Sequence, residues 1–312
     1  MKAKLSSIAA GIGLALACSV ASAQDSQGIV TVTQQGIGNT SHAEQAGAPL
    51  GVPSTATITQ TGNNNHVGGP GSTTGGILQL NNPGPVIAQI QQTGNGNNAG
   101  ITQTRNGGVM LIRGFITQLG DGNSATLTQD LISDSSAFIE QTGNGNVTDV
   151  AQPSVGISSF QSRQYGNGNR VTVTQSGTAY RQPDITQTGD GNVASVVIDL
   201  NPFGGPTIVQ TGTLNTASTI QTASEESNIL IDQVGSGNQA DGSQSGLRHL
   251  IDIDQNGIGN QAGANQTGVG DNRALIAQTG NGNIAIVRQV GQGYVANVSQ
   301  AGSNNYTNIY QH

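Results

Sequence analysis

The fold is decided by a short stretch near the C-terminus, which reads QTGNGNIAIVRQ from Gln278 to Gln289. It holds a Gln, a glycine-rich turn that ends at Asn283, a segment of alternating apolar residues and a second Gln. Glycine supplies the backbone freedom for a sharp turn. Alternation of Ala285 and Val287 with other residues predicts a β-strand with one apolar face. The stretch therefore predicts a turn followed by a strand.

The same stretch recurs along the chain, because the pattern Q-x-G-x-x-N occurs twelve times. Successive copies are 26, 32, 26, 23, 23, 23, 23, 23, 22, 23 and 22 residues apart, so the period settles near 23 after Gln118. In ten of the twelve copies a second Gln follows six residues after the Asn, and Gly71 and Ile198 occupy that position in the other two. A period of this length indicates a solenoid with one strand-turn-strand-turn unit per coil.

Four recurring positions define each unit. The first Gln is Gln34, Gln60, Gln92, Gln118, Gln141, Gln164, Gln187, Gln210, Gln233, Gln255, Gln278 or Gln300. The Asn is Asn39, Asn65, Asn97, Asn123, Asn146, Asn169, Asn192, Asn215, Asn238, Asn260, Asn283 or Asn305. The second Gln is Gln103, Gln129, Gln152, Gln175, Gln221, Gln244, Gln266, Gln289 or Gln311, with Gln45 as the earliest. The turn glycines are Gly94, Gly120, Gly143, Gly166, Gly189, Gly212, Gly235, Gly257, Gly280 and Gly302.

Charge placement assigns the two faces of the strands. The positions two and four residues before the first Gln, and two and four after the Asn, carry no charged residue in any unit. The neighbouring positions hold the charged residues Glu140, Arg163, Asp232, Asp252, Asp254, Arg273 and Arg288. We therefore expect one buried face and one solvent-exposed face.

A Gln or Asn on a buried face costs about 1 to 3 kcal/mol when its amide is unpaired. Stacking of coils at about 4.8 Å removes this cost, because each amide then bonds the equivalent amide above and below. The sequence thus predicts an all-β solenoid of about twelve coils with two stacked sheets of cross-β type. Five early prolines, at positions 49, 53, 70, 83 and 85, predict irregular units with insertions over residues 24–91 and regular coils over 92–312.

Composition excludes several classes of protein. Of 312 residues, 47 are Gly, 33 Gln and 30 Asn, whereas charged residues make up 9% and aromatic residues 3%. A core of large side chains is therefore not expected, and a chain kept disordered by charge would carry more charged residues. The net charge of -7 and the lack of a Lys/Arg run predict no nucleic-acid partner.

The first 23 residues predict a secretory signal peptide. Lys2 and Lys4 precede an apolar segment, and the small residues Ala21-Ser22-Ala23 form a cleavage site. Cleavage would leave Gln24 as the first residue and remove Cys18, the single cysteine. A lipoprotein with a lipidated Cys18 is the alternative. No later apolar run is long enough for a transmembrane segment, so none is expected in the mature chain.

The unit resembles the curlin repeat of bacterial curli fibre subunits. The resemblance rests on Q-x-G-x-x-N-x-A followed by a Gln four residues later, complete in Gln92 to Gln103 and in Gln118 to Gln129, and it covers about residues 28–312. It implies an extracellular functional amyloid that is exported through an outer-membrane pore, builds biofilm matrix and mediates adhesion. It also implies a homopolymer that has a second fibre subunit as a partner. Twelve units exceed the handful typical of curli subunits, so a major and a minor, nucleating subunit both remain open.

No catalytic, metal or cofactor site is predicted. The four histidines lie in different units without ligand spacing and are expected to face solvent. Asp252 and Asp254 share a strand face, but no unit departs from the repeat to build a cleft for a glycosidase pair. The remaining alternative to a self-assembling structural subunit is a monomeric solenoid adhesin or carbohydrate-binding module.

Overall fold

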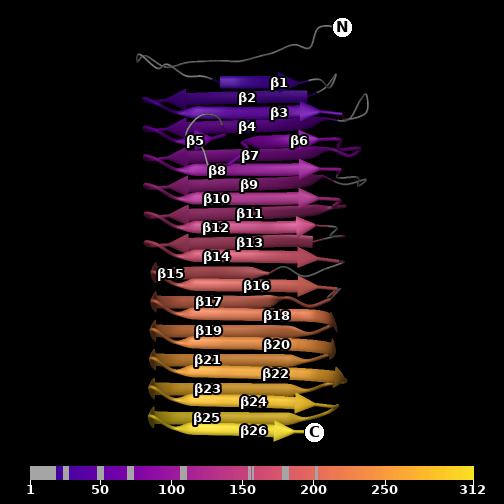
Figure 1. The fold of residues 1–312 in the computed structure, drawn as a ribbon, viewed down its shortest axis with the longest axis vertical. Coiled ribbons are helices and arrows are strands. Elements are labelled where there is room, and N and C mark those ends of the chain that lie inside the picture. The colour runs from indigo at the N-terminus through magenta and orange to yellow at the C-terminus, as the bar shows by residue number, and fades with distance from the viewer. Residues whose placement is uncertain are drawn as a thin grey trace. The chain divides into compact units, whose positions relative to one another are not determined.

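A computed structural model describes residues 19–23, 28–47, 53–68, 74–105, 111–153, 156, 158–177, 183–200 and 203–312, with only the backbone described for 19–23 and Ser158. The chain forms two compact units, residues 1–157 and 158–312. Each unit contains two sheets, A and B, whose strands are all parallel and lie one above another in Figure 1. In total the chain makes about 11 turns with a period of about 23 residues, which confirms the predicted all-β solenoid at close to the predicted number of coils.

The strands of the first unit alternate between its two sheets. Sheet A contains β1 (Ser19–Ala23), β3 (Thr40–Ala46), β5 (His66–Val67), β6 (Ile77–Leu80), β8 (Asn98–Thr104), β10 (Ser124–Asp130) and β12 (Val147–Pro153). Sheet B contains β2 (Gly28–Gln35), β4 (Ser54–Thr61), β7 (Val86–Thr93), β9 (Ile112–Leu119) and β11 (Ser135–Thr142).

The second unit repeats this arrangement. Sheet A contains β14 (Arg170–Ser176), β16 (Val193–Asp199), β18 (Thr216–Glu225), β20 (Gln239–Leu247), β22 (Gln261–Val269), β24 (Ile284–Val290) and β26 (Tyr306–Gln311). Sheet B contains β13 (Ser158–Tyr165), β15 (Asp184–Asp190), β17 (Pro206–Thr213), β19 (Asn228–Ser236), β21 (Leu250–Ile258), β23 (Arg273–Asn281) and β25 (Val295–Ser303).

Strand register follows the repeat. Gln233 pairs with Gln210 and Gln255, and Ile231 with Ile208 and Ile253, so equivalent residues of successive coils lie directly above one another. Among the described pairings the register shifts at a bulge between Thr222 and Ser224 in β18. Identical residues therefore stack in columns, which is the arrangement that amide ladders require.

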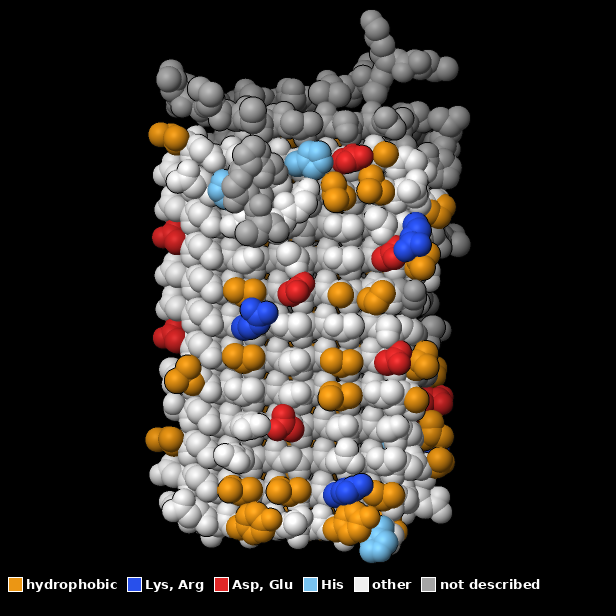
Figure 2. All heavy atoms as spheres, viewed as in Figure 1, with side chains coloured by type: hydrophobic (Ala, Val, Ile, Leu, Met, Phe, Trp, Pro, Cys, Tyr) orange, Lys and Arg blue, Asp and Glu red, His pale blue; other side chains and the backbone are white. Residues whose placement is uncertain are grey.

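The core lies between the sheets and consists mainly of Ile, Val and Ala side chains, together with the buried Gln and Asn residues. Ile90 and Ile185 are fully buried, and Ile253 is too, whereas its neighbour Asp254 is exposed. The predicted faces are confirmed, since the seven charged residues of the predicted outer face are exposed or half-buried. Figure 2 shows the charged side chains of one face spread over it, some beside a charge of opposite sign, without a large patch of one sign.

An insertion interrupts one coil of the first unit. Ser41 of β3 pairs with Val67, whereas Ala43 pairs with Ile77, so the chain leaves the sheet after β5 and returns at β6. Pro53, Pro83 and Pro85 lie between strands. Pro49 and Pro70 lie outside the described residues, as do residues 1–18 of the predicted leader. The predicted boundary between residues 24–91 and 92–312 stays a prediction.

The face assignment has a direct test. Lys in place of Ile253 would place an unpaired charge between Ile231 and Ile276, and we expect Ile253→Lys to lower the free energy of unfolding by several kcal/mol. Asp254→Lys changes an exposed side chain beside Asp232, so we expect a change within about 0.5 kcal/mol or a small gain. Urea unfolding of the freshly desalted chain, followed by circular dichroism, compares the two. Equal losses in both variants would show that the register is wrong by one residue.

Candidate functional site: the amide ladders and their ends

The first-Gln column forms a continuous hydrogen-bonded ladder within each unit. In the first unit each Nε2 donates to the Oε1 of the next Gln, from Gln34 through to Gln141, at 2.6–2.9 Å. In the second unit the same bonds run from Gln164 to Gln300 at 2.7–2.9 Å. The other N–H of each inner Gln is used as well, as in Gln210, whose Nε2 donates to the Val193 carbonyl at 3.0 Å. These buried amides therefore satisfy their hydrogen bonds along the stack.

The Asn column forms a second ladder that runs in the opposite sense. In the second unit the Nδ2 of each Asn donates back to the Oδ1 of the preceding Asn at 2.9–3.1 Å, from Asn192 to Asn305. The same Nδ2 also donates to the turn-glycine carbonyl of the next coil, as from Asn192 to Gly212 at 2.9 Å. In the first unit Asn97 and Asn123 make equivalent bonds. The Asn ladder thus ties each turn to the coils before and after it.

The turn glycines are needed for a close approach as well as for their conformation. All ten predicted turn glycines have a positive φ, such as +117° at Gly94. A Cβ atom placed on Gly94 would lie 2.1 Å from the Gly120 carbonyl oxygen of the next coil. A side chain at this position would therefore force neighbouring turns apart and break the stack.

The second-Gln column forms a third ladder, which Ile198 interrupts. It runs from Gln45 to Gln152 at 2.6–3.1 Å in the first unit and from Gln221 to Gln311 at 2.7–3.1 Å in the second. Ile198 stacks between Gln175 and Gln221, and the buried Gln221 Oε1 has no hydrogen-bond partner. The exception in the sequence pattern is therefore a break in the ladder.

Sequence reasoning missed one member of this ladder. Gln79 of β6 accepts from Gln45 and donates to Gln103, so it fills the position that simple counting assigned to Gly71. The signal was present, because Gln79 follows Ile77 with the spacing seen before the other ladder residues. The insertion between β5 and β6 hid this residue, because Gln79 does not stand six residues after the Asn of its unit.

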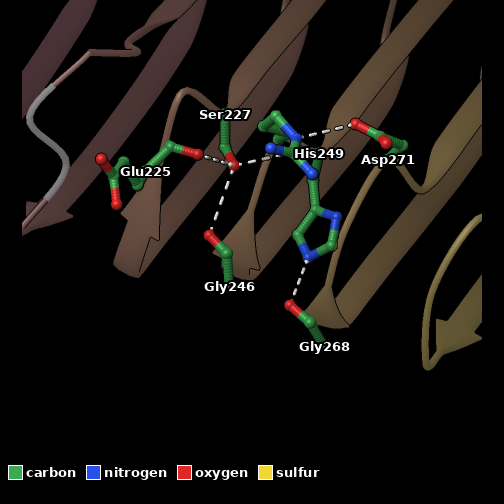
Figure 3. Close-up of polar contacts among 7 residues, drawn as sticks. Glu225, Ser227, Gly246, His249, Gly268 and Asp271 are labelled. Atoms are coloured by element: carbon green, nitrogen blue, oxygen red, sulfur yellow. Dashed lines mark hydrogen bonds and ion pairs between the residues drawn. The ribbon is translucent and has the colours of Figure 1, made fainter.

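A fourth buried column was not predicted. It lies in the second unit at the turns that lead from a strand of sheet A to the next strand of sheet B. Ser227 Oγ lies 3.1 Å from the Glu225 carbonyl and accepts from the His249 backbone N–H at 3.0 Å (Figure 3). The His249 Nε2 lies 3.0 Å from the Gly268 carbonyl oxygen. Asn272 continues the column, since its Nδ2 donates to the Gly291 carbonyl at 2.9 Å. Different residue types share this column, which explains why no repeat was visible.

The expectation that all four histidines face solvent is wrong for His249. His249 is 1% exposed, and burial lowers the pKa of its imidazole. His42 and His66 are half-buried, and His312 is exposed and stacks on Tyr310. Among the described residues no group of three or more His, Cys, Asp or Glu side chains could hold a metal ion.

Acidic residues gather on the outer face of sheet B in the second unit. Asp254 is the register partner of Asp232, and Asp252 lies two residues away on the same face. Burial raises the pKa of the Asp232 carboxyl, and the negative charge of Asp254 adds to this. The same two causes raise the pKa of Asp252, although Arg273 opposes them. Asp252 and Asp254 border an open depression of about 270 Å³ on the sheet surface.

Comparison with known proteins adds no relative. No family model matches the sequence, and no curated protein matches it. Within the described residues no helix is long and apolar enough to cross a membrane. The geometry that the chain itself provides, parallel coils joined by buried amide ladders, is consistent with curlin-like repeats.

The ladders predict unequal costs for two equivalent substitutions. Gln233→Leu removes the acceptor of Gln210 Nε2 and the donor to Gln255 Oε1. Each buried group left without a hydrogen bond lowers the free energy of unfolding by about 1 to 3 kcal/mol. Gln221 lies next to the break at Ile198. Gln221→Leu therefore leaves only one ladder atom, Gln244 Oε1, without its partner. We expect Gln233→Leu to lower the urea midpoint by clearly more than Gln221→Leu. The reverse order would contradict a stabilising role for the ladder.

The acidic cluster predicts how stability depends on pH. A carboxyl whose pKa is raised by folding binds more protons in the folded state, so stability falls as pH rises from the unfolded pKa of about 3.9 through the raised value. We expect Asp254→Asn to reduce this fall, because it removes the repulsion felt by Asp232 and Asp252.

The urea midpoint measured from pH 3 to pH 7, compared with that of the unmodified chain, tests this. Asp241→Asn on sheet A removes one charge elsewhere and is the matched control. An identical pH profile for Asp254→Asn and the unmodified chain would contradict the coupling.

Proposed function

We propose that the chain is a secreted structural subunit of curli-like amyloid fibres, which assembles by stacking coil on coil. The observation that carries this proposal is that three amide ladders run through the coils of each unit, and that among the described strands β2 and β26 each pair on one side only. A strand edge with unpaired N–H and C=O groups recruits further strands. A buried amide at such an edge gains its missing partner when another coil is added.

The outer surface supports a structural role for the chain. The depressions described on it are open to solvent, and the charged side chains of the face in Figure 2 form no large patch of one sign. We therefore propose that the protein is not an enzyme and that its activity is assembly. Its proposed partners are further copies of itself, a second fibre subunit and an outer-membrane secretion pore. Its proposed location is the extracellular surface.

Biofilm matrix formation and adhesion follow as proposed consequences of assembly. Each added subunit extends the outer faces of both sheets and displays the same side chains again. A surface of this kind binds through many weak, repeated contacts, which gives avidity without a deep pocket.

Unseeded assembly of the chain beginning at Gln24 tests the proposal. We expect fibres in electron microscopy and a meridional reflection at about 4.7 to 4.8 Å, because the coil spacing becomes the fibre repeat. Mass spectrometry of surface material from the producing cells should find the same N-terminus. A stable monodisperse monomer that binds carbohydrate would instead support the adhesin alternative.

A further inference from the structure

Gly263 of β22 is a glycine that neither backbone conformation nor packing requires. It pairs with Asp241 and Ile286 without a shift of register, and its φ is not positive. A Cβ atom added to Gly263 would meet nothing within 4 Å. The same addition gives a contact of 2.7 to 2.9 Å at the other described mid-strand glycines without a positive φ, Gly100, Gly114 and Gly242. A glycine inside a strand lowers stability, and where no bulge or close packing explains it, it marks a place that a ligand approaches.

Two hollows on the outer face of sheet A meet at Gly263. One has a volume of about 340 Å³ and the other about 300 Å³, and Asp241, Gly263 and Ile286 line both. The first also borders Asn265 and the second Gln261, so the hollows follow one another along β22 for about 13 Å. Each volume is at the lower end of the range of small-molecule sites. The missing side chain of Gly263 therefore joins them into one trough, called here the Gly263 trough.

The lining of the Gly263 trough combines aliphatic side chains with hydroxyl and amide groups. Ile220 and Ile286 are 44% and 42% exposed and offer apolar surface. Gln239 Nε2 donates to Asp241 Oδ2 at 3.0 Å, which orients that carboxylate. Within the described part of the chain the side chains of Ser243 and Gln261 make no hydrogen bond. Their hydroxyl and amide groups both donate and accept, so they are available to a ligand that does the same.

The charges of the trough favour an uncharged ligand. Asp241 and Arg288 are the two charged residues in its described lining, and their charges cancel. Arg288 does not pair with Asp241 in the described chain, since its guanidinium carbon lies 5.4 Å from the centre of the Tyr310 ring. A ligand of high net charge of either sign would thus meet one charge of its own sign.

An extended peptide is not favoured either. Peptides that bind sheets usually add a strand at a free edge and use backbone hydrogen bonds. β22 is paired on both sides, with β20 and β24, so it offers no free backbone groups (Figure 1). Recognition in the trough must therefore come from side chains.

We infer that the Gly263 trough binds a neutral glycan, a chain of uncharged hexose units. A hexose ring has a C–H face that packs on aliphatic side chains such as Ile286, and hydroxyl groups that bond with Asp241, Ser243, Gln261 and Asn265. Because the trough is open to solvent, the chain lies along it with one side exposed. Gly263 leaves the space in which a sugar ring reaches the sheet.

This inference does not depend on assembly. The trough lies on an outward face and is formed by strands that each have a neighbour on both sides, so a soluble chain and a fibre subunit both present it. If the chain assembles, each subunit adds one such site. A failure to form fibres would overturn the proposed function and leave the glycan site to be judged by binding alone.

Filling the trough tests the inference. Gly263→Gln places a side chain in open space and removes a strand glycine, so we expect its urea midpoint to equal or exceed that of the unmodified chain. The freshly desalted chains are titrated with the neutral hexasaccharides cellohexaose, maltohexaose and chitohexaose, and binding is followed by ligand-observed NMR. We expect the unmodified chain to bind at least one of them, and Gly263→Gln to lower that affinity at least about tenfold.

Ser195→Gln is the matched control. Ser195 stands three coils earlier in the same outward column and does not line the trough, so this variant should bind like the unmodified chain. If Gly263→Gln lowers the urea midpoint, Gly263→Ala, which adds a single carbon to the same space, replaces it and should also weaken binding.

Three results would overturn the inference. The first is that the unmodified chain binds none of the neutral hexasaccharides, and the second is that Gly263→Gln and Gly263→Ala bind as it does. The third is a preference for a charged or peptide ligand, seen as tighter binding of hexagalacturonate or of an unfolded casein peptide that Gly263→Gln abolishes.

Discussion

The structure depends on the hydrogen-bonding requirement of a buried side-chain amide. A Gln in a thin β core has two N–H donors and an acceptor that must be paired, and one coil cannot pair them all. The backbone of the facing strand takes one N–H, as the Val193 carbonyl does for Gln210. The remaining donor and acceptor need an identical amide about 4.8 Å above and below. This requirement fixes the residue type, the register and the parallel direction of the strands together.

The same requirement explains why the core can be so small. Ala and Ile alternate with Gln on the inner face, and few large side chains are fully buried, Phe160 being the largest among the described residues. The apolar area per coil is modest, but each coil is covered on both sides by its neighbours. Stability then depends on the contacts between successive coils. These contacts are weakest where one coil carries a different residue type in a column. Ile198 is such a point, because its apolar side chain gains burial but leaves Gln221 Oε1 without a partner.

Polarity of the ladders is the feature that links this core to the proposed assembly. Within the second unit the Gln amides donate in one direction along the coils and the Asn amides in the other, so the two ends of a ladder differ chemically. A solenoid can prevent addition at its ends with a capping element. Here the described terminal coils keep the same Gln and Asn residues as the inner ones, and β1 is the one strand that covers the first coil of sheet A.

The sequence by itself determined the period, the two faces and the amide columns, because these follow from alternation and from residues that recur at a fixed distance. Gln233, Asn238 and Ile253 lie where the repeat predicted them, since every coil imposes the same environment on the same position. Only the tertiary structure decided which residues occupy a column where the sequence repeat is interrupted. Gln79 fills a column after an insertion, and His249 shares a buried column with Ser227 and Asn272. Such positions are defined by neighbours in adjacent coils, some 22 to 34 residues away in the chain, and not by local spacing.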